Sequence, residues 1–278
     1  MRLSALHKVL TEGRITTLSI PEIIDALNGR TLVIFNVDAT SDNPDADYFQ
    51  ILRISAVAID TTKQGREVGQ FDAISSLSIS ALREIDRQDR LIAAGQWDGS
   101  SIPIRDILSQ YNYDIEDETE RPQGIELAIR FRSFIYGLRN PVLIGYEAHR
   151  DLYFINEELS QTFIKVPVFD MLEFAKIYFE PILRVMVRRG SKKAQEMSEK
   201  IWDAARGEHI LTAPNLGRVF GVHANSALAN SARKLASIFP AMFKFIQSNK
   251  ALIQDPEYIQ LSDQAKQTIK YPTEWNVE

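Results

Sequence analysis

Apolar runs separated by polar turns dominate the first third of the chain. One run, from Leu32 to Phe35, ends in a polar cluster, and a longer run extends from Ile51 to Ile59. The connector 41–45 between them is made of serine, aspartate, asparagine and proline, which are typical turn residues. A third run, Glu67 to Ile74, follows another polar turn. Because strands joined by short polar turns pair with their neighbours along the chain, this pattern predicts a three-stranded antiparallel meander.

Helical periodicity begins later, in alternation with short apolar strands. Apolar residues recur at helical spacing from Ile125 to Leu138, which predicts an amphipathic helix. A short strand at Val142–Gly145 precedes a helical run from Leu152 to Leu159, and a strand at 165–170 precedes a helix at 171–179. The sequence therefore predicts an α/β protein with a mixed sheet, three antiparallel strands followed by parallel strands, flanked by helices.

Two segments near the beginning depart from this regular pattern. Residues 1–30 are predicted to be a helical N-terminal extension, which ends at Asn28 and Gly29. Residues 76–123 are predicted to be an insertion with one helix, 80–90, that begins at Ser80 as its N-cap. The acidic run 114–120 inside this insertion indicates a solvated loop.

Two further segments lie in the second half. Residues 181–209 are rich in arginine and lysine and predict a second insertion built of basic helices. Residues 246–278 predict a polar C-terminal tail that is either a docking arm or partly disordered. The main domain is therefore expected to span residues 31–245.

Composition narrows the class of protein without changing the predicted fold. The 278 residues carry a formal net charge of −5, which argues against a surface coated with positive charge but permits a local basic groove. Cysteine is absent, which excludes disulfides and thiolate metal sites and favours an intracellular location. No stretch reaches the roughly 18 apolar residues of a membrane span, so no membrane partner is expected.

Five segments occur in a characteristic order of strands and polar clusters. They are Asn-Val-Asp-Ala-Thr at 36–40, the strand 51–57, Gly-Tyr-Glu-Ala-His-Arg-Asp at 145–151, Phe-Asp-Met-Leu-Glu-Phe-Ala at 169–175 and Asn-Ser-Ala-Leu-Ala-Asn-Ser at 225–231. This order resembles the DEDD 3′–5′ exonucleases, whose motifs are Asp-x-Glu-Thr, IxxIxAV, GHNAxFD, DTLxLA and HxALxDA. The resemblance implies a ribonuclease-H-like fold across residues 30–245.

The resemblance also implies where a catalytic site would lie, and the chain departs from the family there. Intact members place four carboxylates around two divalent cations, which clamp the attacking and leaving oxygens. Asn36 stands at the first Asp position, and Asp38 stands at the Glu position. Asp151 retains the second-motif Asp, whereas Asn230 replaces the last one and Asn225 replaces the general-base His.

These departures limit the metal chemistry that the resemblance allows. Asp38 and Asp151 are the remaining carboxylate ligands, so at most a remnant site for one weakly held Mg²⁺ or Mn²⁺ is expected, and no cofactor is certain. Glu147 and His223 are candidate replacements for a ligand and for the base, and Asp42 or Asp45 could enter from the neighbouring turn. Each is better explained as an ordinary surface or loop residue.

The basic segment offers a possible flank for a nucleic-acid strand. Its candidate binding residues are Arg184, Arg188, Arg189, Lys192 and Lys193. Arginine and lysine clusters near an aromatic residue suit single-stranded RNA or DNA. A solvated pair of helices packed on the domain explains the same residues.

The sequence leaves three functions open. The first is a catalytically inactive or strongly impaired exonuclease-like domain, a pseudoenzyme that acts as a nucleic-acid-binding or protein-interaction module. The second is an active but atypical metal-dependent 3′–5′ exonuclease that acts on single-stranded RNA or DNA. The third is a structural subunit of a larger complex, whose helices and C-terminal segment dock to protein partners.

Overall fold

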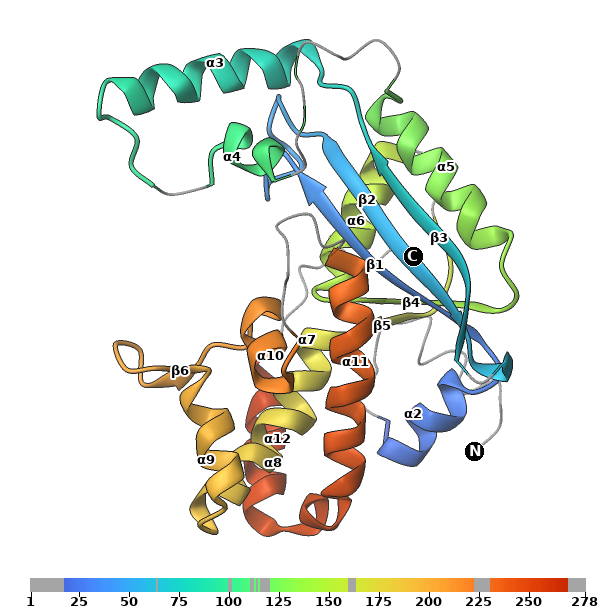
Figure 1. Ribbon diagram of the computed structural model, residues 1–278, viewed down its shortest axis with the longest axis vertical. Helices are drawn as coiled ribbons and strands as arrows, with labels where there is room; N and C mark the ends of the chain where they lie inside the picture. The colour runs from blue at the N-terminus through green and yellow to red at the C-terminus, as the bar shows by residue number, and fades with distance from the viewer. Residues whose placement is uncertain are drawn as a thin grey trace.

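A five-stranded mixed sheet organises the molecule (Figure 1). The computed structural model describes residues 18–269 except 64, 100–101, 111–112, 114, 116–120, 160–163 and 223–230. The strands are β1 (Thr31–Ala39), β2 (Ile51–Asp60), β3 (Arg66–Ile74), β4 (Pro141–Gly145) and β5 (Val168–Asp170), in the order β3-β2-β1-β4-β5. β1 and β3 both pair antiparallel with β2, whereas β4 pairs parallel with β1 and β5. The predicted α/β fold class, a mixed sheet of three antiparallel strands followed by parallel strands and flanked by helices, is confirmed.

Helices bury both faces of this sheet because the central strand is apolar on both sides. In β1, Val33 and Phe35 pack against helices α5 (Gly124–Tyr136) and α6 (Ala148–Leu159). Leu32 and Ile34 face the opposite core, which includes residues of α11 (Ser231–Ser248). Such continuous apolar strands are typical of a sheet that is covered on both faces.

The N-terminal segment contributes one described helix, α2 (Ile20–Leu27). Ser19 caps it, and the Glu22 carboxylate accepts hydrogen bonds from the backbone N–H and the hydroxyl of Ser19, each at 2.8 Å. Its buried residues, Ile23 among them, join the same core as Leu32. The first 17 residues of the predicted helical extension lie outside the described part of the chain.

The insertion at 76–123 contains two helices and a small core of its own. Helix α3 (Ile79–Ala93) begins at Ser78, whose hydroxyl accepts the Ala81 N–H at 3.1 Å, so the prediction of Ser80 as the N-cap was wrong. Helix α4 (Ile104–Ser109), which was not predicted from the sequence, is held by Gln88, whose side chain accepts the Ile104 N–H at 2.9 Å. A third apolar cluster joins them to β2: Leu52, Leu77, Ala81, Ile85, Ile104 and Leu108.

A helical lobe follows β5 (Figure 1). Helix α7 (Met171–Phe174), a π-helical turn η3 (Ala175–Phe179) and helix α8 (Glu180–Arg188) follow one another without a break. Helix α9 (Lys192–Glu199) comes next, and then a short hairpin of β6 (Trp202–Asp203) and β7 (Glu208–His209). The 181–209 segment is therefore helical only as far as α9, because the turn before Gly207, which has φ +66°, reverses the chain.

Helix α10 (Ala213–Phe220), α11, a 3₁₀ turn η4 (Lys250–Gln254) and α12 (Pro256–Thr268) complete the lobe. Residues 246–269 are therefore mostly helical, whereas a polar tail was expected over 246–278. Tyr258 of α12 is buried, and its hydroxyl donates to the Ile177 carbonyl at 3.2 Å. Only Tyr258 and Ser262 of α12 are buried, so its apolar periodicity is too sparse to be recognised in the sequence.

In the part of the chain that the structure describes, no helix has both the length and the apolar character needed to cross a membrane.

Glu180 connects helix α8 to strand β7, and we expect its contribution to stability to depend on pH. Its carboxylate accepts hydrogen bonds from Arg184 at 2.6 Å and contacts His209 at 3.1 Å. Burial raises the pKa of this carboxyl, but the His209 and Arg184 contacts outweigh burial and hold the pKa below its ordinary value of 4.5. A lowered folded-state pKa contributes stability above the unfolded pKa, and this stability is lost as the pH falls through the folded pKa.

We therefore expect Glu180→Gln to lower the free energy of unfolding by about 1–3 kcal/mol at pH 7. Wild type and variant should converge as the pH falls below 4.5, as measured by urea denaturation at several pH values. Glu196→Gln, at an exposed position on α9, is the control, with no comparable pH-dependent difference expected. A gap between wild type and Glu180→Gln that is constant with pH would contradict the prediction.

Candidate metal and nucleic-acid site

Two candidate ligands lie side by side at the end of β1. Asn36 and Asp38 share one face of the strand, and the Asn36 side-chain amide donates to the Asp38 carboxylate at 3.2 Å. The residue opposite Asp38 on β2 is Arg53, and directly opposed residues share a sheet face. The Arg53 guanidinium binds Asp72 of β3 through two hydrogen bonds of 2.8 Å. A cationic residue therefore already lies beside Asp38.

Asp151 lies in the first turn of α6 and is buried. Its carboxylate accepts the backbone N–H of Val37, the residue between Asn36 and Asp38, at 3.0 Å. Burial raises the pKa of Asp151 to about 8, even though Arg150 and the Val37 N–H favour the ionised form. The second-motif carboxylate is thus tied to β1, as a site at this edge of the sheet requires.

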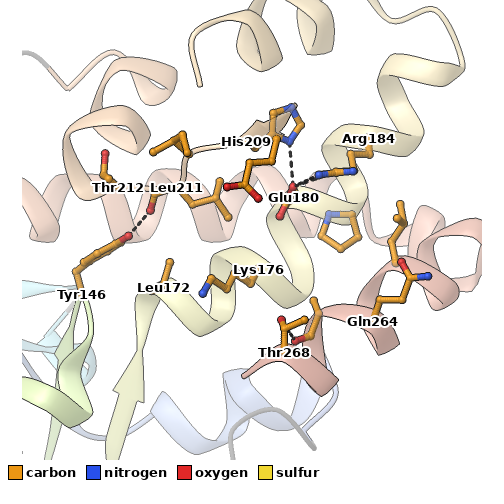
Figure 2. A pocket seen from close by; sticks show the side chains of 15 residues that line it. Tyr146, Leu172, Lys176, Glu180, Arg184, His209, Leu211, Thr212, Gln264 and Thr268 are labelled. Atoms are coloured by element: carbon orange, nitrogen blue, oxygen red, sulfur yellow. Dashed lines mark hydrogen bonds and ion pairs between the residues drawn. The ribbon is translucent and has the colours of Figure 1, made fainter. Parts of the chain in front are cut away.

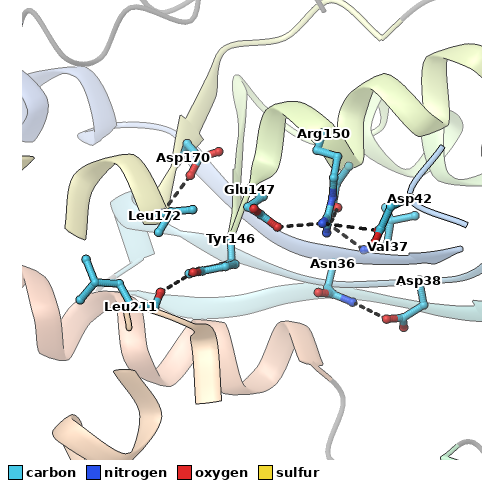
Figure 3. A network of polar contacts seen from close by, with 11 residues as sticks. Asn36, Val37, Asp38, Asp42, Tyr146, Glu147, Arg150, Asp170, Leu172 and Leu211 are labelled. Atoms are coloured by element: carbon cyan, nitrogen blue, oxygen red, sulfur yellow. Dashed lines mark hydrogen bonds and ion pairs between the residues drawn. The ribbon is translucent and has the colours of Figure 1, made fainter. Parts of the chain in front are cut away.

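The guanidinium of Arg150 lies among three carboxylates (Figure 3). The nitrogen–oxygen distances are 2.8 Å to Glu147, 3.3 Å to Asp151 and 3.7 Å to Asp42. The sequence prediction did not single out Arg150, although a signal was present. In the GHNAxFD motif this position is Phe, so a cation stands here beside the retained Asp.

Glu147 adopts an unusual backbone conformation at the same place. Its φ is +57°, in the left-handed region, which costs a non-glycine residue roughly 1–2 kcal/mol. The corresponding motif residue is Asn, which tolerates this region better. Here the strained position holds a carboxylate that pairs with Arg150 and is not directed at an open ligand site.

The predicted ligands do not assemble into a metal centre among the described residues. In Figure 3, Asn36 and Asp38 point away from β1 on the side opposite to Glu147 and Arg150. Within the described ranges, no group of three or more histidines and carboxylates is suited to hold a metal ion.

The remaining predicted residues do not complete a site in the described part of the chain. Asp45 is exposed in its turn. His223, Asn225 and Asn230 lie outside the described residues. The described carboxylates therefore do not fit a centre for two cations. Arg150 already lies beside Asp151, and Arg53 lies opposite Asp38.

The basic segment separates into paired arginines and exposed lysines. Arg184, Arg188 and Arg189 form ion pairs with Glu180, Glu257 and Asp255, respectively. Two of these carboxylates come from α12 and its N-cap, so these pairs fasten α8 to α12. Lys192 and Lys193, at the start of α9, are exposed. Of the five predicted nucleic-acid contacts, the two lysines are therefore the more accessible to a ligand.

A pocket of about 520 Å³ opens beside this segment (Figure 2). Its walls come from the α7–α8 run, residues 208–212 and α12, and Lys176 lies near its centre. Tyr146 closes one end, where its hydroxyl donates to the Leu211 carbonyl. The sequence did not predict this pocket, because its walls come from segments that are distant along the chain.

No protein-family model and no curated protein matches the sequence. Among solved structures, exonuclease I from Methylocaldum szegediense is similar, with 12% identity and a TM-score of 0.46 over 79% of this chain and 43% of that one. E. coli Exonuclease I in complex with a 5cy-dA13 oligonucleotide has 11% identity and a TM-score of 0.46, with the same coverage. A 3′-exonuclease that recognises the histone mRNA stem-loop has 10% identity and a TM-score of 0.42 over 80% of this chain and 83% of that one. The chain spans less than half the length of the exonuclease I proteins.

Proposed function

We propose that the chain is an exonuclease-like domain that does not carry out the two-metal reaction and acts as a binding module for single-stranded nucleic acid or a protein partner. The position of Arg150 is the observation that carries this proposal. Its guanidinium lies against Glu147 and Asp151, at the place where a metal ion would lie in an active site. Asp151 then serves to hold α6 against β1.

Electrostatics support this proposal. A divalent cation needs several oxygen ligands, and a fixed guanidinium repels it from the same carboxylates. Asp38 stands opposite Arg53, so the second remaining ligand also has a cationic neighbour. An active atypical exonuclease would require Arg150 to leave Glu147 and Asp151 before a metal ion could enter.

Exposed cations and an aromatic ring favour nucleic acid as the ligand. Lys192 and Lys193 lie on α9, and Trp202 of the adjoining hairpin is 48% exposed. An exposed ring can stack on a base while lysines contact the phosphates. These groups replace Arg184, Arg188 and Arg189 as the favoured contacts, because the arginines are already held by carboxylates.

The test uses the purified protein with labelled single-stranded RNA and DNA in the presence of Mg²⁺ or Mn²⁺. We expect no metal-dependent trimming and no metal-induced rise in Tm. We expect salt-sensitive binding that weakens in a Lys192→Ala, Lys193→Ala double variant, with a shallower salt dependence because two phosphate contacts are lost. Lys250→Ala, a change of an exposed lysine on η4, is the matched control.

Two outcomes would overturn parts of this proposal. Trimming that requires metal and disappears in an Asp38→Ala, Asp151→Ala double variant would establish an active exonuclease. Absence of both trimming and binding would leave the structural-subunit function, for which the readout is complex formation with a protein partner.

A further inference from the structure

A second group of polar side chains lies in the helical lobe, on different elements from the β1 site. Ser198 belongs to the last turn of α9, His209 to β7, and Glu180 begins α8. The Ser198 hydroxyl oxygen lies 2.7 Å from Nε2 of His209. Nδ1 of the same ring lies 3.1 Å from a carboxylate oxygen of Glu180. The three side chains thus form a continuous hydrogen-bonded series.

The chemistry of the three groups fixes the direction of the hydrogen bonds. An ionised carboxylate can only accept, so in the neutral ring the hydrogen lies on Nδ1 and points to Glu180. Nε2 is then the acceptor, and the hydroxyl of Ser198 donates to it. A serine that donates to a histidine oriented by a carboxylate is the arrangement of an activated nucleophile.

The surroundings favour this arrangement over a freely rotating surface serine. The His209 side chain is only 3% exposed, and the ring of Trp202 packs edge-on against it with centroids 5.5 Å apart. Arg184 donates two hydrogen bonds to the same oxygen of the Glu180 carboxylate, which limits its movement. Ser198 itself is partly exposed.

We propose that Ser198 is a reactive nucleophile with His209 as its general base and Glu180 as the positioning residue, and that it cleaves small activated carboxylic esters. The Ser198 oxygen attacks the carbonyl carbon, and its proton passes to Nε2 of His209. The bond to the leaving alcohol breaks, the alcohol takes that proton, and the acyl group remains on Ser198. A water molecule then attacks the acyl ester, releases the acid and restores Ser198. This activity does not depend on the proposed function of the β1 site.

The test is covalent labelling of the full chain with a fluorophosphonate, followed by peptide mapping, together with hydrolysis of p-nitrophenyl acetate. Labelling forms an oxygen–phosphorus bond at Ser198 and releases fluoride, and the proton passes to His209 and then to solvent. We expect one dominant adduct, at Ser198, and loss of ester hydrolysis in Ser198→Ala. Ser237→Ala is the matched control, because Ser237 is also a helical serine and its hydroxyl donates to a backbone carbonyl, that of Arg233. This variant should label and hydrolyse as wild type does.

The role of Glu180 needs a readout that stability alone would not change. We expect Glu180→Gln to slow labelling of Ser198 on the order of 10²-fold at a temperature where the variant remains folded. The chain has four histidines, so ¹⁵N-histidine spectra can resolve the tautomer of His209. The Nδ1–H form should dominate in wild type and diminish in Glu180→Gln. Absence of an adduct at Ser198 in the folded protein, or labelling that Glu180→Gln leaves unchanged, would overturn the proposal.

Discussion

Replacing Arg150 with methionine should lower the free energy of unfolding by about 1.4 kcal/mol more at pH 9 than at pH 5, because the buried Asp151 carboxyl then loses the cation that favours its ionised form. Asp151 is 1% exposed, and Arg150 is the nearest cation to it in the ion pairs of the described chain. Methionine keeps much of the length and apolar contact of the side chain. The lower free energy of unfolding therefore measures the effect of removing the charge and not the effect of creating a cavity.

The loss should become smaller at low pH. Burial raises the pKa of Asp151 to about 8 from an ordinary value of 3.8, so at pH 5 the carboxyl of the folded protein is already protonated. A raised carboxyl pKa means that the folded state binds the proton more tightly, so stability falls as the pH rises through this range. Removing the guanidinium raises the pKa further. Urea denaturation at pH 5 and pH 9 should therefore show a larger gap between wild type and Arg150→Met at pH 9.

Two comparison proteins sharpen this experiment. Arg130→Met removes an exposed ion pair with Glu126 on α5 and should cost less than about 1 kcal/mol at either pH. Adding Asp151→Asn to Arg150→Met should recover most of the loss at pH 9, because no buried charge then remains. An equal loss at both pH values, or no recovery in the double variant, would show that Arg150 acts through packing.

The same variant bears on the function. If Arg150 takes the place of a metal ion, its removal leaves Glu147 and Asp151 as free carboxylates. A divalent cation should then raise the Tm of Arg150→Met more than that of wild type. The comparison tests whether Arg150 occupies the place where a divalent cation would bind.

The sheet was predictable from the sequence because its signal is local. Each of the runs 32–35, 51–59 and 67–74 is apolar over consecutive or alternating positions, and short turns determine their pairing. The retained Asp151 was predictable for a similar reason, since it follows β4 within one motif. These features need no information about distant contacts.

The counterions of the site could not be predicted in this way. Arg150 meets Asp42 only because the turn after β1 lies beside α6, and Arg53 meets Asp38 through the register of β1 with β2. The contact of Ser198 with His209 depends similarly on the reversal of the hairpin before β7. Pairing between distant segments decides whether a carboxylate is a free ligand or part of an ion pair, and residue type alone does not reveal it.

The contact between Tyr258 and Ile177 is one of those that hold α12 to the helical lobe, and Tyr258→Phe should cost about 1–3 kcal/mol. The residue four positions after Ile177 is Pro181, which has no N–H to donate to the Ile177 carbonyl. The chain widens into the π-helical turn η3 at this point, and the Tyr258 hydroxyl takes the place of the missing donor at 3.2 Å. Burial raises the pKa of Tyr258 to about 12, so the hydroxyl keeps its proton at neutral pH.

A double-mutant cycle tests this account. Pro181→Ala restores an N–H four residues after Ile177, so the carbonyl gains a donor within its own helix. We expect Tyr258→Phe to cost less in the Pro181→Ala background than in wild type, as measured by urea denaturation at pH 7. Equal costs in both backgrounds would mean that the hydroxyl contributes through another contact. A smaller cost would show that Pro181 creates the need for a donor and that α12 supplies it, so one proline in α8 anchors the C-terminal helix to the helical lobe.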